Sequence, residues 1–207
     1  MTAIVRPRSM LITLGLLLVL VFWLSLALGP VSLPLGETLL AGLRLLGMPV
    51  DGGDTQQAEL ILGQIRLPRS LLGIAVGSVL ALSGVAMQGL FRNPLADPGL
   101  VGVSGGAALG AAIAIVGGSM LGGLPPAIEP YLLSVSAFVG GLIVTAVVYR
   151  FGRSDGQTNV ATMLLAGVAM TAMAGAGVGL FTYLADDATL RTLTFWNLGS
   201  LNGASYS

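Results

Sequence analysis

Residues 70–91 read SLLGIAVGSVLALSGVAMQGLF and contain no charged side chain, although Arg69 precedes them and Arg92 follows them. A helix that crosses a bilayer needs about 20 mostly apolar residues, so this stretch predicts a membrane-spanning helix. The whole chain has the same character, because 55% of its 207 residues are hydrophobic and only 9% are charged. A water-soluble domain has roughly 25% charged residues. A soluble enzyme is therefore excluded.

Other uncharged stretches predict the remaining spans. We expect one all-α domain over residues 1–207, a polytopic bundle of transmembrane helices. The spans are expected near residues 10–28, 70–91, 99–117, 130–149 and 160–184, with a sixth from residue 195 onward. The chain would then hold five full spans and the start of a sixth, and it would be incomplete at the C-terminus. The first span is longer than the roughly 7–15 apolar residues of a cleaved signal peptide, which favours a retained helix.

Missing residue types exclude several kinds of chemistry. The chain has no lysine, no histidine and no cysteine. A Walker A phosphate loop needs its lysine, Ser-His and Cys-His catalytic pairs need histidine, and the usual zinc sites need histidine or cysteine. The net charge is +0, and the scattered arginines form no basic face for nucleic acid. We therefore expect no catalytic residues, no cofactor, no bound metal and no nucleic-acid partner.

No ionisable side chain lies inside the five expected spans. Charged residues within a membrane usually mark proton relays or ion sites, so their absence weakens the case for a proton-coupled carrier. The sequence favours a transport channel subunit that is driven by a partner. An ion-coupled secondary transporter stays open as an alternative, since backbone carbonyls and the hydroxyls of Ser83, Ser104 and Thr171 could bind Na⁺. A membrane scaffold that transports nothing is a third interpretation.

The arginines predict a cytoplasmic N-terminus. With that orientation the inner segments hold five arginines and the outer segments four: Arg6, Arg8, Arg92, Arg150 and Arg153 inside, and Arg44, Arg66, Arg69 and Arg191 outside. The positive-inside rule favours this arrangement, and the arginines at the N-terminus and at 150–153 decide it. Residues 35–47, LGETLLAGLRLLG, have leucines at helical spacing, so we expect a short amphipathic helix in the membrane interface.

Glycine spacings predict where helices pack closely. GxxxG patterns occur at Gly73–Gly77, at Gly102–Gly106–Gly110 and at Gly175–Gly179, and such patterns let helix backbones approach each other. Glycine-rich apolar helices also produce these spacings by chance. The Asn93-Pro94 and Asp97-Pro98 pairs predict a tight turn before the third span. The segment 91–110 is therefore either a plain hairpin turn or the beginning of a discontinuous helix.

Two arginines, Arg66 and Arg69, belong to the sequence QIRLPRS at the outer end of the second span. Pro68 is typical of a helix start, so both guanidinium groups are expected at the membrane surface. One interpretation is that they only anchor the helix end in the lipid headgroups. The other is that they bind carboxylates of a partner protein, for which the forked guanidinium is well shaped.

The string RLPRSLLGIAVGSVLALSGVAMQGLFRNPLADPGLVGVSGGAALG, residues 66–110, resembles the iron-complex permease family of ABC importers. Members of this family carry siderophore–iron, haem or vitamin B12 across the inner (plasma) membrane of bacteria. The resemblance continues in ATMLLAGVAM at 161–170 and in LRTLTFWNLGSL at 190–201, and so covers most of the chain.

The resemblance implies a fold and a set of partners. Family members look like ten-helix subunits that form a homodimer, with the substrate path along the dimer axis. A periplasmic or lipid-anchored substrate-binding protein docks outside, and two separate ABC ATPase subunits hydrolyse ATP in the cytoplasm. The family pattern assigns binding-protein docking to Arg66 and Arg69. It assigns the cytoplasmic gate to Asn159, Val160 and Ala161, although small hydroxyl residues of the vitamin B12 permease gate are replaced here by Val160 and Ala161.

The residues 183–201, YLADDATLRTLTFWNLGSL, look most like the haem and siderophore members, so an iron complex is favoured over vitamin B12. A vitamin B12 permease stays open as an alternative. Family members are longer than this chain, and the last spans and the coupling helices that contact the ATPase are expected beyond residue 207.

Overall fold

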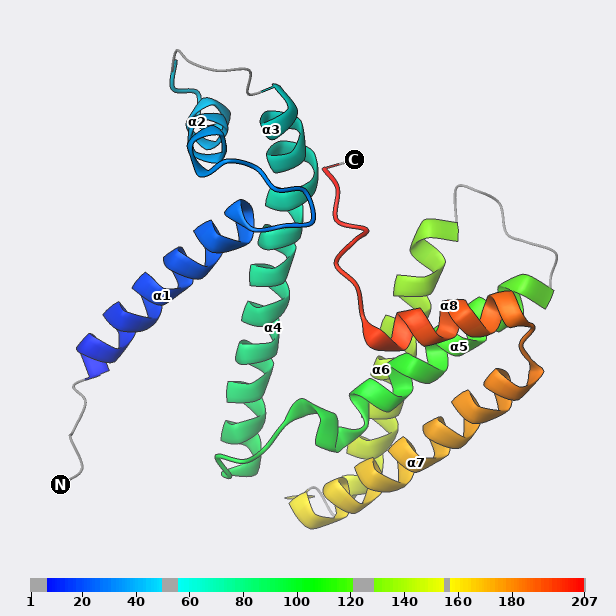
Figure 1. The fold of residues 1–207 in the computed structure, drawn as a ribbon. Coiled ribbons are helices and arrows are strands. Elements are labelled where there is room, and N and C mark those ends of the chain that lie inside the picture. The colour runs from blue at the N-terminus through cyan, green and yellow to red at the C-terminus, as the bar shows by residue number, and fades with distance from the viewer. Residues whose placement is uncertain (1–6, 50–55, 121–128, 155–156, 207) are drawn as a thin grey trace. The chain divides into compact units, whose positions relative to one another are not determined.

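The computed structural model of the chain describes residues 7–49, 56–120, 129–154 and 157–206 (Figure 1). Almost all of the regular structure in these residues is helical, which confirms the all-α prediction. The chain divides into two compact units, Met1–Ser78 with Leu201–Ser207, and Val79–Ser200.

The first unit contains α1 (Pro7–Ala27), α2 (Leu35–Leu45), α3 (Gln56–Ile61), a π-helical turn (Leu62–Arg66) and the start of α4 (Leu67–Phe91). Its small core is formed by one buried apolar side chain from each of α1, α2, α3 and the π turn: Leu26, Ala41, Ala58 and Leu62. An ion pair of 2.9 Å between Arg44 of α2 and Glu59 of α3 joins the two short helices. The amphipathic helix expected at 35–47 is therefore present as α2.

The second predicted span is part of a longer helix, because α3, the π turn and α4 run without a break from Gln56 to Phe91. Pro68 lies inside this helix and not at its start. A proline within a helix cannot donate a backbone hydrogen bond, and its ring collides with the carbonyl four residues earlier. The helix accommodates Pro68 with the π turn, in which the N–H of Leu67 bonds to the carbonyl of Leu62.

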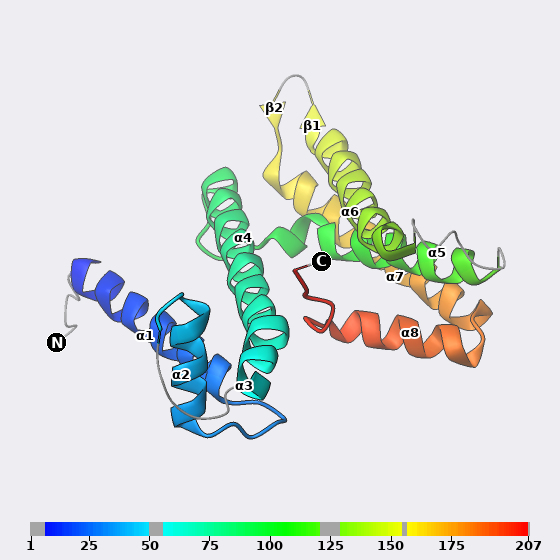
Figure 2. The same ribbon diagram turned by 90° about the horizontal axis from the view of Figure 1, so that it is seen from above.

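The second unit contains the rest of α4, a 3₁₀ turn (Pro98–Val101), α5 (Val103–Met120), α6 (Glu129–Gly152), α7 (Val160–Leu184) and α8 (Asp187–Leu198). Figures 1 and 2 show α5, α6 and α7 packed against one another, with α8 beside α5. Figure 2 also shows the hairpin of β1 (Arg153–Ser154) and β2 (Gln157–Thr158) beyond the end of α6, with Arg153 paired to Thr158 and Ser154 to Gln157.

Glycines let α5 and α6 approach within backbone contact. A Cβ added to Gly106 would lie 2.5 Å from the carbonyl oxygen of Gly140, and one added to Gly110 would overlap the carbonyl of Ser136. The reverse also holds, because a Cβ on Gly140 would overlap the carbonyl of Gly106. The prediction of close packing at Gly106 and Gly110 is therefore confirmed. In contrast, a Cβ on Gly77, Gly175 or Gly179 would meet nothing within 4 Å in the described part of the chain.

The turn before α5 fits the discontinuous-helix interpretation. The Asp97 side chain accepts a hydrogen bond of 2.7 Å from the N–H of Gly99 and so caps the 3₁₀ turn. Gly102 then has a φ of 79°, a left-handed conformation that glycine adopts readily. Helix α5 begins only at Val103, four residues after the expected start of the third span at residue 99.

Within the described residues, four helices are long and apolar enough to cross a membrane: Arg8–Ala27, Gln56–Phe91, Tyr131–Gly152 and Val160–Leu184. The apolar part of α5, Val103–Ser119, is shorter than these. The expected start of a sixth span at Phe195 lies within α8, which begins at Asp187 and ends at Leu198. Asp186 caps the start of this helix, and Gly199 follows its end.

Most apolar side chains on the long helices are exposed in this chain. In the apolar window of Gln56–Phe91, for example, 0% of the residues are buried. Soluble proteins rarely expose contiguous apolar patches of more than a few hundred Å². These faces are therefore suited to lipid or to further membrane helices.

We predict that Gly140→Leu destabilises the α5–α6 pair. The side chain would enter the space occupied by the Gly106 carbonyl, and overpacking of this kind typically costs about 1–3 kcal/mol. Thermal unfolding of the protein in detergent, followed by circular dichroism, measures the effect. Gly117→Leu is the matched control on α5, because a Cβ there meets nothing within 4 Å. Equal melting temperatures for the two variants would contradict the packing described here.

Candidate functional site

The Arg66 side chain points into the protein. Only 7% of the residue is exposed, and its guanidinium group lies against the end of α1 and the chain that follows. Nη1 donates hydrogen bonds to the carbonyl oxygens of Leu26 at 2.6 Å and Ala27 at 2.8 Å, and Nη2 donates one to Val31 at 2.5 Å. The expectation that both guanidinium groups stand at the surface is therefore wrong for Arg66.

These contacts make Arg66 a cap for the C-terminus of α1. The last carbonyls of a helix have no partner within that helix and carry partial negative charge. A guanidinium group satisfies several of them at once and brings the favourable positive charge. Gly29 leaves the space that this requires, because a Cβ there would lie 2.8 Å from Nη2 of Arg66.

Arg69 lies in a different environment three residues later. Its side chain is half-buried, and its Nε atom is buried without a hydrogen-bond partner in the described part of the chain. The neighbouring Ser70 contacts α1 through its hydroxyl, which is 2.8 Å from that of Ser25. Of the two arginines, Arg69 is the more exposed.

The three residues expected at a cytoplasmic gate lie at the start of α7. Asn159 is the N-cap, and its Oδ1 accepts a hydrogen bond of 3.1 Å from the N–H of Thr162. Its own N–H donates to the carbonyl of Gly152 at 2.8 Å, which closes the β1–β2 hairpin onto the end of α6. Val160 is half-buried against the core cluster that contains Val148 and Met163, whereas Ala161 is exposed.

The hydroxyl groups considered for an ion site already bond within their own helices in two of three cases. Ser83 Oγ donates to the carbonyl of Val79 at 2.6 Å, and Thr171 Oγ1 donates to that of Gly167 at 2.8 Å. Ser104 is exposed. Across the described residues, no group of three or more His, Cys, Asp or Glu side chains is arranged to hold a metal ion.

A polar cap that was not predicted from the sequence lies at the start of α8. Asp186 caps α8, and its carboxylate accepts a hydrogen bond of 2.8 Å from the N–H of Thr189. Hydrogen bonds from the side chain and the backbone of Thr189 lower the pKa of Asp186 below its usual value. The signal was present in the sequence, since Asp is one of the residues preferred at the N-cap of a helix.

We predict that Arg66→Ala loosens the connection between α1 and α2. Loss of hydrogen bonds from a charged donor costs about 1.5–3 kcal/mol, and three carbonyls lose their partner. Hydrogen exchange of residues 28–33 should become faster, and the melting temperature in detergent should fall. Arg69→Ala is the matched control and should leave this exchange unchanged. Gly29→Ala should resemble Arg66→Ala, because its methyl group displaces the guanidinium group.

We also predict that the first turn of α8 depends on pH. Because the pKa of Asp186 is lowered by folding, its cap stabilises α8 above the ordinary carboxyl pKa and is lost as the pH falls through the lowered value. Asp186→Ala should speed hydrogen exchange in residues 187–190 at neutral pH and remove this acid dependence. Asp187→Ala, next to it, is the control. Equal exchange in the two variants would contradict the capping role.

The chain was compared with known proteins. The model of the FecCD transport family matches residues 17–207. The chain is 44% identical over 204 residues to the hemin transport system permease protein HmuU of Yersinia pestis, which covers 98% of this chain and 56% of that protein. It is 37% identical over 201 residues to the vitamin B12 import system permease protein BtuC of Klebsiella pneumoniae, covering 97% of this chain and 54% of the relative.

A solved structure has the same fold. It is a metal-chelate type ABC transporter in an inward-facing conformation, with a TM-score of 0.73 and 31% sequence identity, and the match covers 96% of this chain and 56% of that one. The chain thus spans about half the length of the relatives it matches. Because the family model covers nearly the whole sequence, the chain belongs to the FecCD transport family.

Proposed function

We propose that the chain is part of the membrane-spanning permease subunit of a binding-protein-dependent ABC importer for an iron complex, either haem or a ferric siderophore. The observation that carries this proposal is the 44% identity to a hemin permease across 98% of the chain. The long apolar helices, which hold no acid or base in their central turns, fit a conduit whose energy arrives from another subunit.

The proposal includes partners that supply what this chain lacks. Two ABC ATPase subunits would hydrolyse ATP, a substrate-binding protein would deliver the cargo, and a second permease copy would complete the path. The subunit would lie in the inner membrane of a bacterial cell, with its N-terminus in the cytoplasm. In that orientation the start of α4 lies outside, and the α6–α7 hairpin with Asn159, Val160 and Ala161 lies at the cytoplasmic gate.

We propose that Arg66 and Arg69 have different roles in docking of the binding protein. Arg69 would contact a carboxylate of the binding protein directly, since its side chain is only half-buried. Arg66 would act through the cap on α1, which holds the neighbouring surface in position. This division follows from burial, because a side chain that is 7% exposed reaches a partner poorly.

A secondary transporter is the alternative from a different class, and vitamin B12 is the alternative cargo. The first would use Ser83, Ser104, Thr171 and backbone carbonyls as an ion site. The second is supported by the 37% identity to a vitamin B12 permease.

The proposed function is tested by growth on single iron sources. The complete permease gene, with its binding protein and ATPase, is placed in a host without its own uptake permeases. We expect growth on haem or on one ferric siderophore, and loss of that growth when the ATPase is inactivated. Growth that survives the inactive ATPase would support a secondary transporter. If no iron source supports growth but labelled vitamin B12 is taken up, the cargo is vitamin B12 and not an iron complex.

We predict that Arg69→Glu weakens binding of the substrate-binding protein without unfolding the permease. Reversal of the charge turns an attraction into a repulsion, so the dissociation constant should rise at least tenfold at low salt and less at high salt. Surface plasmon resonance on permease in nanodiscs measures this.

Arg66→Glu provides the comparison. It should weaken binding only together with a fall in melting temperature, because it removes the cap on α1. Unchanged binding by Arg69→Glu at both salt concentrations would exclude the docking role.

A further inference from the structure

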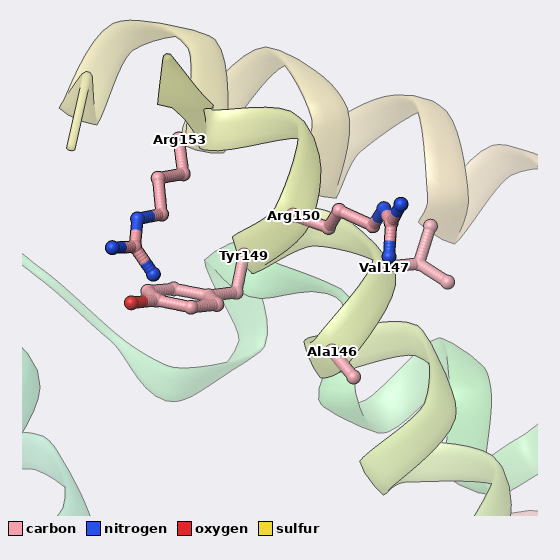
Figure 3. A pocket seen from close by; sticks show the side chains of 5 residues that line it. All are labelled: Ala146, Val147, Tyr149, Arg150 and Arg153. Atoms are coloured by element: carbon pink, nitrogen blue, oxygen red, sulfur yellow. The ribbon is translucent and has the colours of Figure 1, made fainter. Parts of the chain in front are cut away.

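The end of α6 carries a shallow groove that the proposed transport function does not use. It has a volume of about 500 Å³ and is lined by Ala146, Val147, Tyr149, Arg150 and Arg153. Residues 146, 149 and 150 recur at three- and four-residue spacing, so they share one side of the end of α6, and Arg153 follows the helix as the first residue of β1. Figure 3 shows the guanidinium group of Arg153 next to the ring of Tyr149, with Arg150 extending beside Val147.

The two arginines in this groove carry charge that the described chain does not neutralise. Both side chains are exposed, and neither has a carboxylate within ion-pair distance among the described residues. Guanidinium groups bind phosphate oxygens through paired hydrogen bonds, which makes an anionic phosphate group a well-matched ligand.

The depth of the groove adds a second requirement for the ligand. The apolar segment Tyr131–Gly152 has a mean hydropathy of 2.2 and is long enough to cross a membrane, so Arg150 lies at its final turn. Ala146 lies one turn before Arg150, about 6 Å further into the apolar layer. Tyr149 is exposed between them, and tyrosine is enriched at the level of lipid headgroups. The groove is therefore basic at its outer end and apolar at its inner end.

We propose that this groove binds an anionic phospholipid of the leaflet that surrounds the end of α6. The phosphate group contacts Arg153 beside the ring of Tyr149, Arg150 adds positive charge on the other side of the helix end, and the first part of an acyl chain lies over Ala146 and Val147. A lipid is favoured over an acidic protein surface because Ala146 and Val147 lie at hydrocarbon depth, which a soluble partner does not reach. The bound lipid would hold the β1–β2 hairpin, which begins at Arg153, at the membrane surface.

The test uses the permease isolated with its partner subunits, stripped of lipid in a neutral detergent. Native mass spectrometry measures binding of dioleoylphosphatidylglycerol, with dioleoylphosphatidylcholine as the uncharged comparison. We expect the Arg150→Gln, Arg153→Gln double variant to bind phosphatidylglycerol about thirty-fold more weakly, the conversion of about 1 kcal/mol for each basic residue near a membrane surface. The matched control is the Arg8→Gln, Arg191→Gln double variant, which removes the same charge elsewhere and should bind normally.

A second variant tests the apolar part of the groove. Ala146→Trp keeps both arginines but fills the inner end, and it should weaken phosphatidylglycerol binding without lowering the melting temperature, since Ala146 is exposed. Unchanged lipid binding in the double variant would overturn the proposal. If inorganic phosphate displaces phosphatidylglycerol as well as the lipid itself does, the groove binds a free anion and the proposal is overturned. Loss of ATPase-subunit binding with normal lipid binding would overturn it in favour of a protein surface.

Discussion

The bilayer offers no hydrogen-bond partners, so every backbone N–H and C=O group within it must be satisfied by the protein itself. Helices do this along their length, and the difficulty is concentrated at their ends. In this chain the ends are closed by side chains: Arg66 on the last carbonyls of α1, Asn159 on the first amides of α7 and Asp186 on those of α8. The first role of each of these polar residues is therefore to cap one end of a helix.

Within the apolar layer, close packing takes over the role that the hydrophobic effect has in water. Lipid tails are as apolar as leucine, so helices gain by backbone approach and van der Waals contact instead. Gly106, Gly110 and Gly140 allow this between α5 and α6, and Gly167 allows it between α7 and the turn at Leu100. Since that turn precedes α5, the interruption at Gly102 is fixed by α7 as well as by its own backbone conformation.

The sequence predicted the helices well and their ends less well. Apolar length alone located α1, α6 and α7, and the bounds of α7 agree with the predicted span at 160–184. The prediction of a helix start failed at Pro68, because a π turn lets the helix continue past this proline. The sequence also did not predict the cap formed by Arg66, because the carbonyls that Arg66 caps are about 40 positions away in sequence. No local pattern encodes a contact of that separation.

The two arginines of the QIRLPRS motif illustrate how one motif can serve two purposes. Residues three apart on a helix lie on neighbouring faces, and here one face meets the end of α1 while the other keeps a buried nitrogen without a partner. A buried donor left unpaired costs free energy, so the Arg69 side chain contributes less to the stability of the fold than the Arg66 side chain does. A ligand oxygen that reached this nitrogen would remove that cost, whereas Arg66 already donates three hydrogen bonds to backbone carbonyls. The motif thus places Arg66, which is fixed against the end of α1, next to Arg69, which is more exposed and has a nitrogen without a partner in the described chain.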